Sequence, residues 1–165
     1  IHRQLSQPVN FETAAHLASS RRSLSTDSAR AIAEAVASSP QPTLGITTDG
    51  RTELWGFDAG RAPDSLPGHL HHLTVGWLHD ALLPALGLDS QAATDGTIGY
   101  RSQPERLLTE LRTGSATVGF WLPPMSGQDF ARAMAGGELL PPKSTRFLPK
   151  VASGLVWSGH DSRLL

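Results

Sequence analysis

Apolar residues recur with a helical period in two segments near the start of the chain. Asn10 is a favourable N-terminal cap for a helix over 11–19. A second helix is predicted from 25 to about 39, because alanines together with Ile32 and Val36 fall on one face. Prolines follow this segment and end the helical pattern.

The pattern then changes to the two-residue period of β-strands. Two β-like runs, 43–47 and 51–57, lie on either side of Asp49-Gly50. An Asp-Gly pair between such runs is a strong local signal for a tight turn. These residues therefore predict a β-hairpin.

The second half of the chain alternates helical and strand-like patterns. The longest helix is predicted over 71–86, and Pro84 inside it predicts a kink or an early end. Gly87 is suited to the left-handed position that follows a helix. The other expected elements are a strand at 97–101, a helix at 104–112, a buried strand at 116–122, a helix at 128–135 capped by Ser126, and a last strand at 155–157.

Strands interleaved with helices predict an α/β or α+β fold, in which a mixed β-sheet is flanked by helices in a single compact domain. Residues 1–60 are expected to supply N-terminal helices and the β-hairpin, and residues 61–165 a C-terminal α/β region. The tryptophans are spaced as core or sheet residues.

Composition narrows the classes of partner. The net charge of −1 gives no bulk attraction to nucleic acid or to an anionic membrane. The chain has no cysteine, which removes disulfides, thiolate zinc sites and cysteine nucleophiles. No apolar run reaches the length of about 18 residues that suggests a membrane span. Because the chain starts at Ile1 without Met or a signal-peptide pattern, we expect a piece of a longer, cytoplasmic protein.

A proline-rich basic segment at 141–150 carries the most distinctive chemistry. Proline fixes φ and lacks an N–H, so the segment is expected to be stiff and extended rather than helical. Its cations and hydroxyls suit a small anionic ligand. In the alternative reading, the lysines lie over the sheet while apolar residues of the segment fill the core. The candidate anion-binding residues are Lys143, Ser144, Thr145, Arg146 and Lys150.

Other catalytic patterns are absent from the sequence. The glycines that a phosphate-binding P-loop places before its lysine do not precede Lys143, and no Gly-x-Ser-x-Gly element is present. The clustered histidines lack the i, i+4 spacing of a helical metal site, so no metal site is predicted. His79 borders the apolar stripe of its helix, and we expect a core histidine hydrogen-bonded to a carbonyl.

Several motifs from His79 onward together resemble a known family. They are Leu78-His79-Asp80, Leu86-Gly87-Leu88, Ile98-Gly99-Tyr100, Gly119-Phe120-Trp121-Leu122-Pro123-Pro124, Gly137-Glu138, Pro142-Lys143-Ser144-Thr145, Phe147-x-Pro149-Lys150 and Ser153-Gly154-Leu155. Their order is similar to the C-terminal part of the bacterial and archaeal family known as domain of unknown function 1015. Residues 1–60 match that family poorly, although Ile1-His2-Arg3 is similar to its Pro-x-His-Arg step.

The resemblance implies a phosphotransferase that is longer than this chain. Family members carry an upstream Asp-Gly-His-His-Arg segment, which is similar to a segment that helps hold nucleotide phosphates in free-serine kinases of the sulfiredoxin and ParB-like fold. This chain lacks that segment, so no cofactor is expected here, and a nucleotide with Mg²⁺ is expected only in the full-length protein. His79 coincides with a family motif.

The function expected on this basis is phosphoryl transfer to or from a small hydroxy amino acid such as serine. His2 would act as an acid or base, and Arg3 would hold an anion, at the cleft with the missing N-terminal half. An ordered end of the chain without such a role is an equal alternative for both residues. A non-catalytic binding domain, or a structural domain that braces an upstream lobe, remains the alternative for the whole chain.

Overall fold

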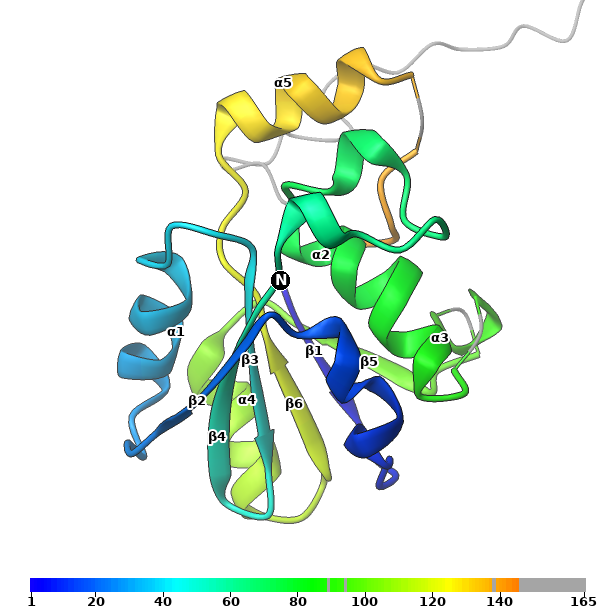
Figure 1. Ribbon diagram of the computed structural model, residues 1–165. Helices are drawn as coiled ribbons and strands as arrows, with labels where there is room; N and C mark the ends of the chain where they lie inside the picture. The colour runs from blue at the N-terminus through cyan, green and yellow to red at the C-terminus, as the bar shows by residue number, and fades with distance from the viewer. Residues whose placement is uncertain (89, 94, 138, 146–165) are drawn as a thin grey trace, which may run out of the picture.

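An antiparallel β-sheet forms the centre of the protein (Figure 1). The computed structural model describes residues 1–88, 90–93, 95–137 and 139–145. The sheet has six strands in the order β2-β4-β3-β6-β1-β5, and every described pairing is antiparallel. The strands are β1 His2–Leu5, β2 Ser20–Leu24, β3 Thr43–Thr48, β4 Arg51–Gly56, β5 Ile98–Arg101 and β6 Val118–Trp121.

Helices pack against this sheet, which confirms the predicted fold class in its α+β form. The sheet is antiparallel where a mixed sheet was expected. Strand β6 lies between β3 and β1, so strands from residues 1–60 and 61–165 alternate within one sheet. The α-helices are α1 Ala29–Ala37, α2 Thr74–Gly76, α3 Leu83–Ala85, α4 Pro104–Arg112 and α5 Gly127–Ala135. The other helical segments are η1 Phe11–Leu17, η2 Ala59–Arg61, η3 Gly68–Leu70, η4 Trp77–Leu82 and η5 Ser90–Ala93.

Local signals in the sequence explain most of these boundaries. Asp49 and Gly50 have φ angles of 50° and 72°, the left-handed conformation that a tight hairpin turn requires, and they join β3 to β4 as predicted. Ser28 caps α1 by accepting a hydrogen bond from the backbone N–H of Ala31 at 3.3 Å, so this helix starts after the predicted residue. The predicted cap Ser126 precedes α5.

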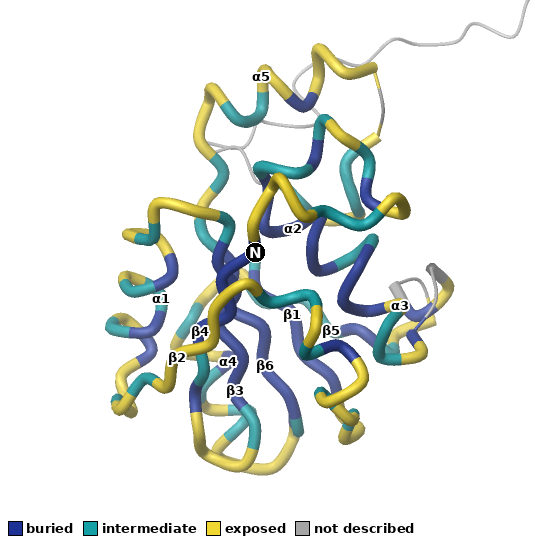
Figure 2. Tube along the Cα trace, in the orientation of Figure 1, coloured by how far each residue is buried: buried dark blue, intermediate teal, exposed yellow. Residues whose placement is uncertain are grey.

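The two faces of the sheet bury separate apolar clusters. Helices α1 and α4 cover one face, where Ile32, Leu107 and Trp121 pack together. Segment η1 and the helical run from α2 to α3 cover the other face, where Leu44 and Phe120 lie in the larger cluster. The central strands are therefore buried on both sides (Figure 2). Three of the tryptophans lie in these clusters as predicted, namely Trp55, Trp77 and Trp121, and Trp157 lies outside the described residues.

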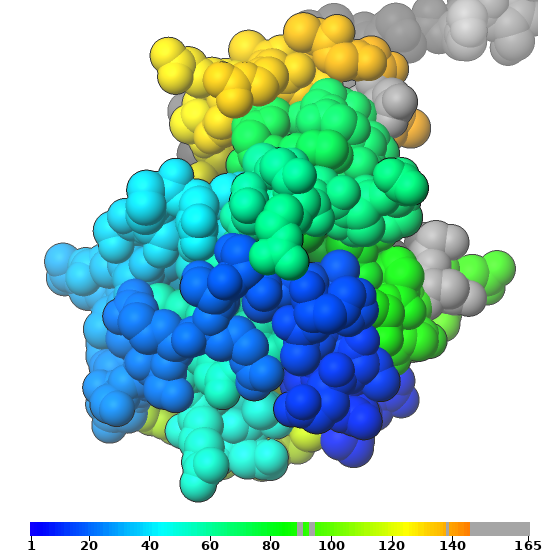
Figure 3. Space-filling model, viewed as in Figure 1, coloured from blue at the N-terminus to red at the C-terminus, as the bar shows by residue number. Residues whose placement is uncertain are grey.

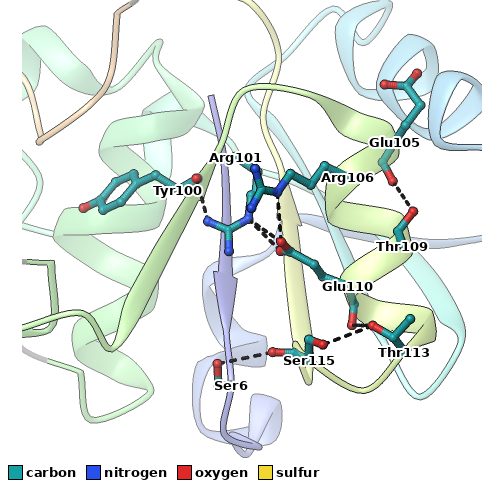
Figure 4. A network of polar contacts seen from close by, with 9 residues as sticks. All are labelled: Ser6, Tyr100, Arg101, Glu105, Arg106, Thr109, Glu110, Thr113 and Ser115. Atoms are coloured by element: carbon teal, nitrogen blue, oxygen red, sulfur yellow. Dashed lines mark hydrogen bonds and ion pairs between the residues drawn. The ribbon is translucent and has the colours of Figure 1, made fainter.

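Strands β1 and β2 were not predicted from the sequence. Strand β2 is an edge strand whose residues are largely exposed, and β1 is buried between β5 and β6. Strand β5 forms the other edge, where Arg101 makes two hydrogen bonds of 2.9 and 2.6 Å to the carboxylate of Glu110 on α4 (Figure 4). This pair fastens the edge strand to the helix that covers it.

Helix α5 lies at one end of the molecule, on the segment around η3 and away from the sheet (Figure 3). Only Ala133 of this helix is buried. The predicted strand at 155–157 lies outside the described residues. None of the described helices is both long and apolar enough to cross a lipid bilayer.

Candidate functional site

Arg3 is a fully buried arginine on the central strand β1. Successive strand residues point to opposite faces, so Arg3 shares its face with Leu5 of the same strand and with Phe120 and Tyr100 on the neighbouring strands. None of its surface is exposed to solvent. Arginine is almost never fully buried unless it is paired, so its partners decide what it can do.

The partners of the Arg3 guanidinium are neutral. Its Nε donates to Nε2 of His79 at 3.1 Å, and Nη2 donates to the carbonyl of Pro142 at 2.9 Å. Nη1 donates to the carbonyl of Ile1, and the guanidinium carbon lies 4.6 Å from the centre of the Tyr100 ring. Within the described part of the chain, no carboxylate pairs with Arg3.

His79 reaches Arg3 from an irregular turn of helix. The run from α2 to α3 is interrupted by η4, which has the wider π-helical hydrogen bonding, with the N–H of Leu83 bonded to the carbonyl of Leu78. Pro84 has no N–H to give to the carbonyl of Asp80, and the hydroxyl of Ser65 donates to that carbonyl at 3.1 Å instead. The helix predicted over 71–86 is found as the run from α2 to α3, in which a π-helical turn that contains His79 precedes Pro84.

Burial lowers the pKa values of both His79 and Arg3. It lowers the pKa of His79 from 6.5 to about 4, and the charge of Arg3 acts in the same direction. Burial also lowers the pKa of Arg3 to about 10, so its guanidinium stays charged at neutral pH. His79 is then neutral and accepts at Nε2, which places its proton on Nδ1. We expected His79 to bond a carbonyl, but its Nε2 accepts a hydrogen bond from the Arg3 guanidinium instead. Because the imidazole is neutral, it does not balance the positive charge of Arg3.

His2 does not share the site of Arg3. It lies on the opposite face of β1, where its Nδ1 accepts a hydrogen bond of 3.2 Å from the N–H of Leu122. Its ring centre is 5.4 Å from that of Trp121. Burial lowers the pKa of His2 to about 4, and the positive charges of the first amino group and Arg3 add to the effect. The expectation that His2 and Arg3 act together at one cleft does not fit this arrangement.

A hollow of about 460 Å³ lies at the end of the sheet and reaches Arg3. Its polar lining comes from segments far apart in the sequence: the entry to α2, the entry to α5 and the proline segment. The lining residues that matter for its chemistry are Arg3, His72, Ser126, Asp129, Arg132 and Ser144. Thr74 fixes one wall, because its Oγ1 accepts a hydrogen bond of 3.1 Å from the N–H of Thr43.

Ser126 holds the acidic side chain of this hollow in place. Its Oγ donates to Oδ2 of Asp129 at 2.7 Å and accepts from the backbone N–H of Asp129 at 3.0 Å. Oδ1 of Asp129 lies 3.8 Å from Nε2 of His72. Mg²⁺ takes several oxygen ligands, and Asp129 is the one carboxylate among the described residues that line this hollow, so these residues do not make a complete site for a resident Mg²⁺.

The predicted anion-binding residues are divided between the hollow and the surface. Ser144 lines the hollow, and its Oγ donates to the carbonyl of Pro141. Thr145 lines a neighbouring hollow of about 350 Å³. Lys143, which was expected to bind the anion, is exposed and is not among the residues that line either hollow. Arg146 and Lys150 lie outside the described residues.

His72 and Asp129 were not singled out as a pair from the sequence. His72 belongs to the clustered histidines that lack the spacing of a helical metal site, and among the described residues no cluster of three metal-ligating side chains is found. Ser126 was recognised as a helix cap, and the Ser-x-x-Asp spacing was the signal that could have drawn attention to Asp129. No protein-family model, curated protein or solved structure matches the chain.

Proposed function

We propose that this domain binds a small anionic ligand in the hollow at the end of the sheet, and that Arg3 is its principal cation. The observation that supports this is a fully buried guanidinium whose hydrogen-bond partners among the described residues are all neutral. Burying a charge without a counter-charge costs several kcal/mol by general estimates. An anionic ligand would supply the missing counter-charge.

The guanidinium has donors to spare for such a ligand. Arginine carries five N–H groups, and three of them take part in the contacts to His79, Ile1 and Pro142. Charged oxygens bind these donors more strongly than a peptide carbonyl does. An anion that enters the hollow would displace the Pro142 carbonyl from Nη2, and Ser144 would then lie beside the ligand.

The wider proposal concerns the full-length protein. The motifs that resemble the domain of unknown function 1015 family support phosphoryl transfer to or from a small hydroxy amino acid such as serine. In this proposal the present domain holds the anionic group, and an upstream half supplies nucleotide and Mg²⁺ in a cytoplasmic protein. The phosphate of the substrate or product is the anion that Arg3 would bind.

A structural role for the same arginine is the second candidate. The contact from Arg3 to the Pro142 carbonyl joins the first strand to the proline segment across the fold. An arginine used only as a clamp would need no ligand. The contact between Arg3 and Pro142 is therefore the observation that favours the alternative, in which the chain is a non-catalytic domain that braces an upstream lobe.

Calorimetric titration of the full chain with inorganic phosphate and with O-phosphoserine separates the two candidates. We expect Arg3→Met to weaken binding by about tenfold or more, since a hydrogen bond to a charged group contributes about 1.5–3 kcal/mol. The matched control is Arg22→Met, at an exposed arginine on β2, which should leave the affinity unchanged.

Near-UV circular dichroism and thermal unfolding show whether each variant is folded. Arg3→Lys keeps the charge and should retain more affinity than Arg3→Met. Absence of phosphate and phosphoserine binding by the wild-type chain, or equal affinity in a folded Arg3→Met variant, would rule out the anion site and leave the clamp.

A further inference from the structure

His72 and Asp129 lie next to each other in the lining of the hollow and have unused hydrogen-bonding capacity. Nε2 of His72 is buried and has no hydrogen-bond partner within the described part of the chain. Its distance of 3.8 Å to Oδ1 of Asp129 exceeds that of a hydrogen bond. The other carboxylate oxygen of Asp129 is occupied by Ser126. Two polar atoms are thus held close together without bonding each other.

A single donor group placed beside both atoms would satisfy them. A group at about 2.8–3.0 Å from each atom fits a separation of this size. Ionised Asp129 only accepts hydrogen bonds, and a neutral histidine protonated on Nδ1 accepts at Nε2. A primary ammonium has three N–H donors and a positive charge, so it can bond both atoms at once and neutralise the carboxylate.

Charges of both signs line the same hollow. Arg3 supplies a buried cation and Asp129 the carboxylate. We propose that Asp129 and His72 form a subsite for the primary ammonium group of the ligand, so that the preferred ligands are zwitterionic amino acids or their phosphates. This inference rests on the proposed anion site at Arg3, and it adds the residues that would select an amino acid over other anions.

The orientation of the carboxylate supports this subsite. Ser126 bonds both the side chain and the backbone N–H of Asp129, which fixes the side chain in the first turn of α5. Oδ1 is the oxygen left for a ligand, and it is the one that lies near His72. The subsite is therefore organised before any ligand binds, which reduces the entropic cost of recognition.

O-phosphoserine and 3-phosphoglycerate form a matched pair of probes, because they differ only in an ammonium against a hydroxyl at one carbon. We expect the wild-type chain to bind O-phosphoserine about tenfold more tightly in calorimetric titrations. Asp129→Asn keeps the size of the side chain and should abolish this preference while leaving the affinity for 3-phosphoglycerate within about threefold. His72→Phe should reduce the preference. Asp64→Asn, at an exposed site, is the matched control and should retain it.

The outcomes separate this inference from the proposed function. If both probes bind equally to the wild-type chain and Arg3→Met weakens both, the anion site stands and the ammonium subsite is wrong. A preference that persists in folded Asp129→Asn and His72→Phe variants would also overturn the subsite, since the ammonium would then be recognised elsewhere. If neither probe binds, both proposals fail.

Discussion

Nε of Arg3 donates a hydrogen bond of 3.1 Å to Nε2 of His79, which joins the central strand β1 to the π-helical turn η4. A carboxylate in the place of His79 would have neutralised the guanidinium. A neutral imidazole instead fixes its orientation and leaves its charge available. This choice of partner distinguishes the site from a buried salt bridge, and it also makes the fold sensitive to acid.

The first prediction is a loss of stability between pH 6.5 and pH 4. His2 and His79 have pKa values of about 4 in the folded state, against an ordinary value of 6.5. The unfolded chain therefore binds more protons in this range, so the free energy of unfolding falls as the pH is lowered. Each histidine should contribute about 3 kcal/mol to the loss. Urea denaturation at several pH values measures it.

The variant His79→Gln tests how much of this pH-dependent loss of stability comes from His79. Glutamine does not titrate, so the variant should show a shallower dependence of unfolding free energy on pH than the wild-type chain. The control is His16→Gln, at an exposed histidine, which should retain the wild-type slope. Identical slopes in all three proteins would contradict the depressed pKa of His79.

The second prediction concerns a polar chain buried under α1. Nε1 of Trp121 donates to Oγ1 of Thr47 at 2.8 Å, and Thr47 also bonds the hydroxyl of Thr52 at 2.8 Å. Thr47→Val keeps the shape of the side chain but leaves the buried indole N–H without an acceptor. We expect it to lower the free energy of unfolding by about 1–3 kcal/mol.

Thr52→Val is the matched comparison for this chain of hydroxyls. It removes the contact between the two threonines but leaves Thr47 to accept from Trp121, so a smaller loss is expected. Urea unfolding followed by tryptophan fluorescence measures both variants. Equal losses would mean that the indole N–H contributes nothing measurable through Thr47.

Much of the fold could be predicted from local patterns, but the strand that carries the site could not. The hairpin at Asp49-Gly50 and the cap at Ser126 depend on nearby residues alone, and both were found as expected. Strand β1 reads His-Arg-Gln-Leu, which has no apolar alternation. It is a buried strand only because β5 and β6, distant in sequence, pair with both of its edges.

The site could be predicted only in part, because it also depends on contacts between segments that are distant in the sequence. Arg3 was a candidate because of a three-residue resemblance, whereas its contact to His79 depends on how β1 and η4 pack in three dimensions. His72 and Asp129 are brought together from different segments, which no spacing in the sequence reveals. Lys143 was chosen for its charge, and charge alone does not say whether a side chain points into a cavity.

The third prediction tests the close packing between the sheet and α1. A Cβ atom at Gly45 would lie 2.9 Å from Cβ of Trp121 and 3.0 Å from Cγ2 of Val36. Gly45→Ala should therefore lower the free energy of unfolding by about 1–3 kcal/mol, as overpacking of a core does. At Gly68 the added Cβ meets no atom within 4 Å, so Gly68→Ala is the control and should change stability by no more than about 0.5 kcal/mol. Chemical denaturation measures both, and a neutral Gly45→Ala would show that β3 can move away from Trp121.

The last prediction concerns the charged network that fastens β5 to α4 (Figure 4). Glu110 receives hydrogen bonds from Arg101 at 2.6 Å and from Arg106 at 3.1 Å. Burial acts to raise the pKa of Glu110, but the bonds from the two arginines outweigh it and leave the pKa below its ordinary value of 4.5. Because this folded-state pKa is depressed, the stabilisation is present above pH 4.5 and is lost as the pH falls through the folded-state value.

Glu110→Gln should consequently lower the free energy of unfolding by about 1 kcal/mol at pH 7, and the difference from the wild-type chain should shrink below pH 4.5. Glu105→Gln is the matched control on the same helix, since Glu105 is exposed and contributes only its backbone carbonyl to the network. Hydrogen exchange of the β5 amides adds a local measurement, because freeing Arg101 should speed exchange at this edge before it affects β3. Unchanged exchange at β5 in Glu110→Gln would mean that pairing with β1 alone holds the edge strand, and that the arginine network is only a surface feature of α4.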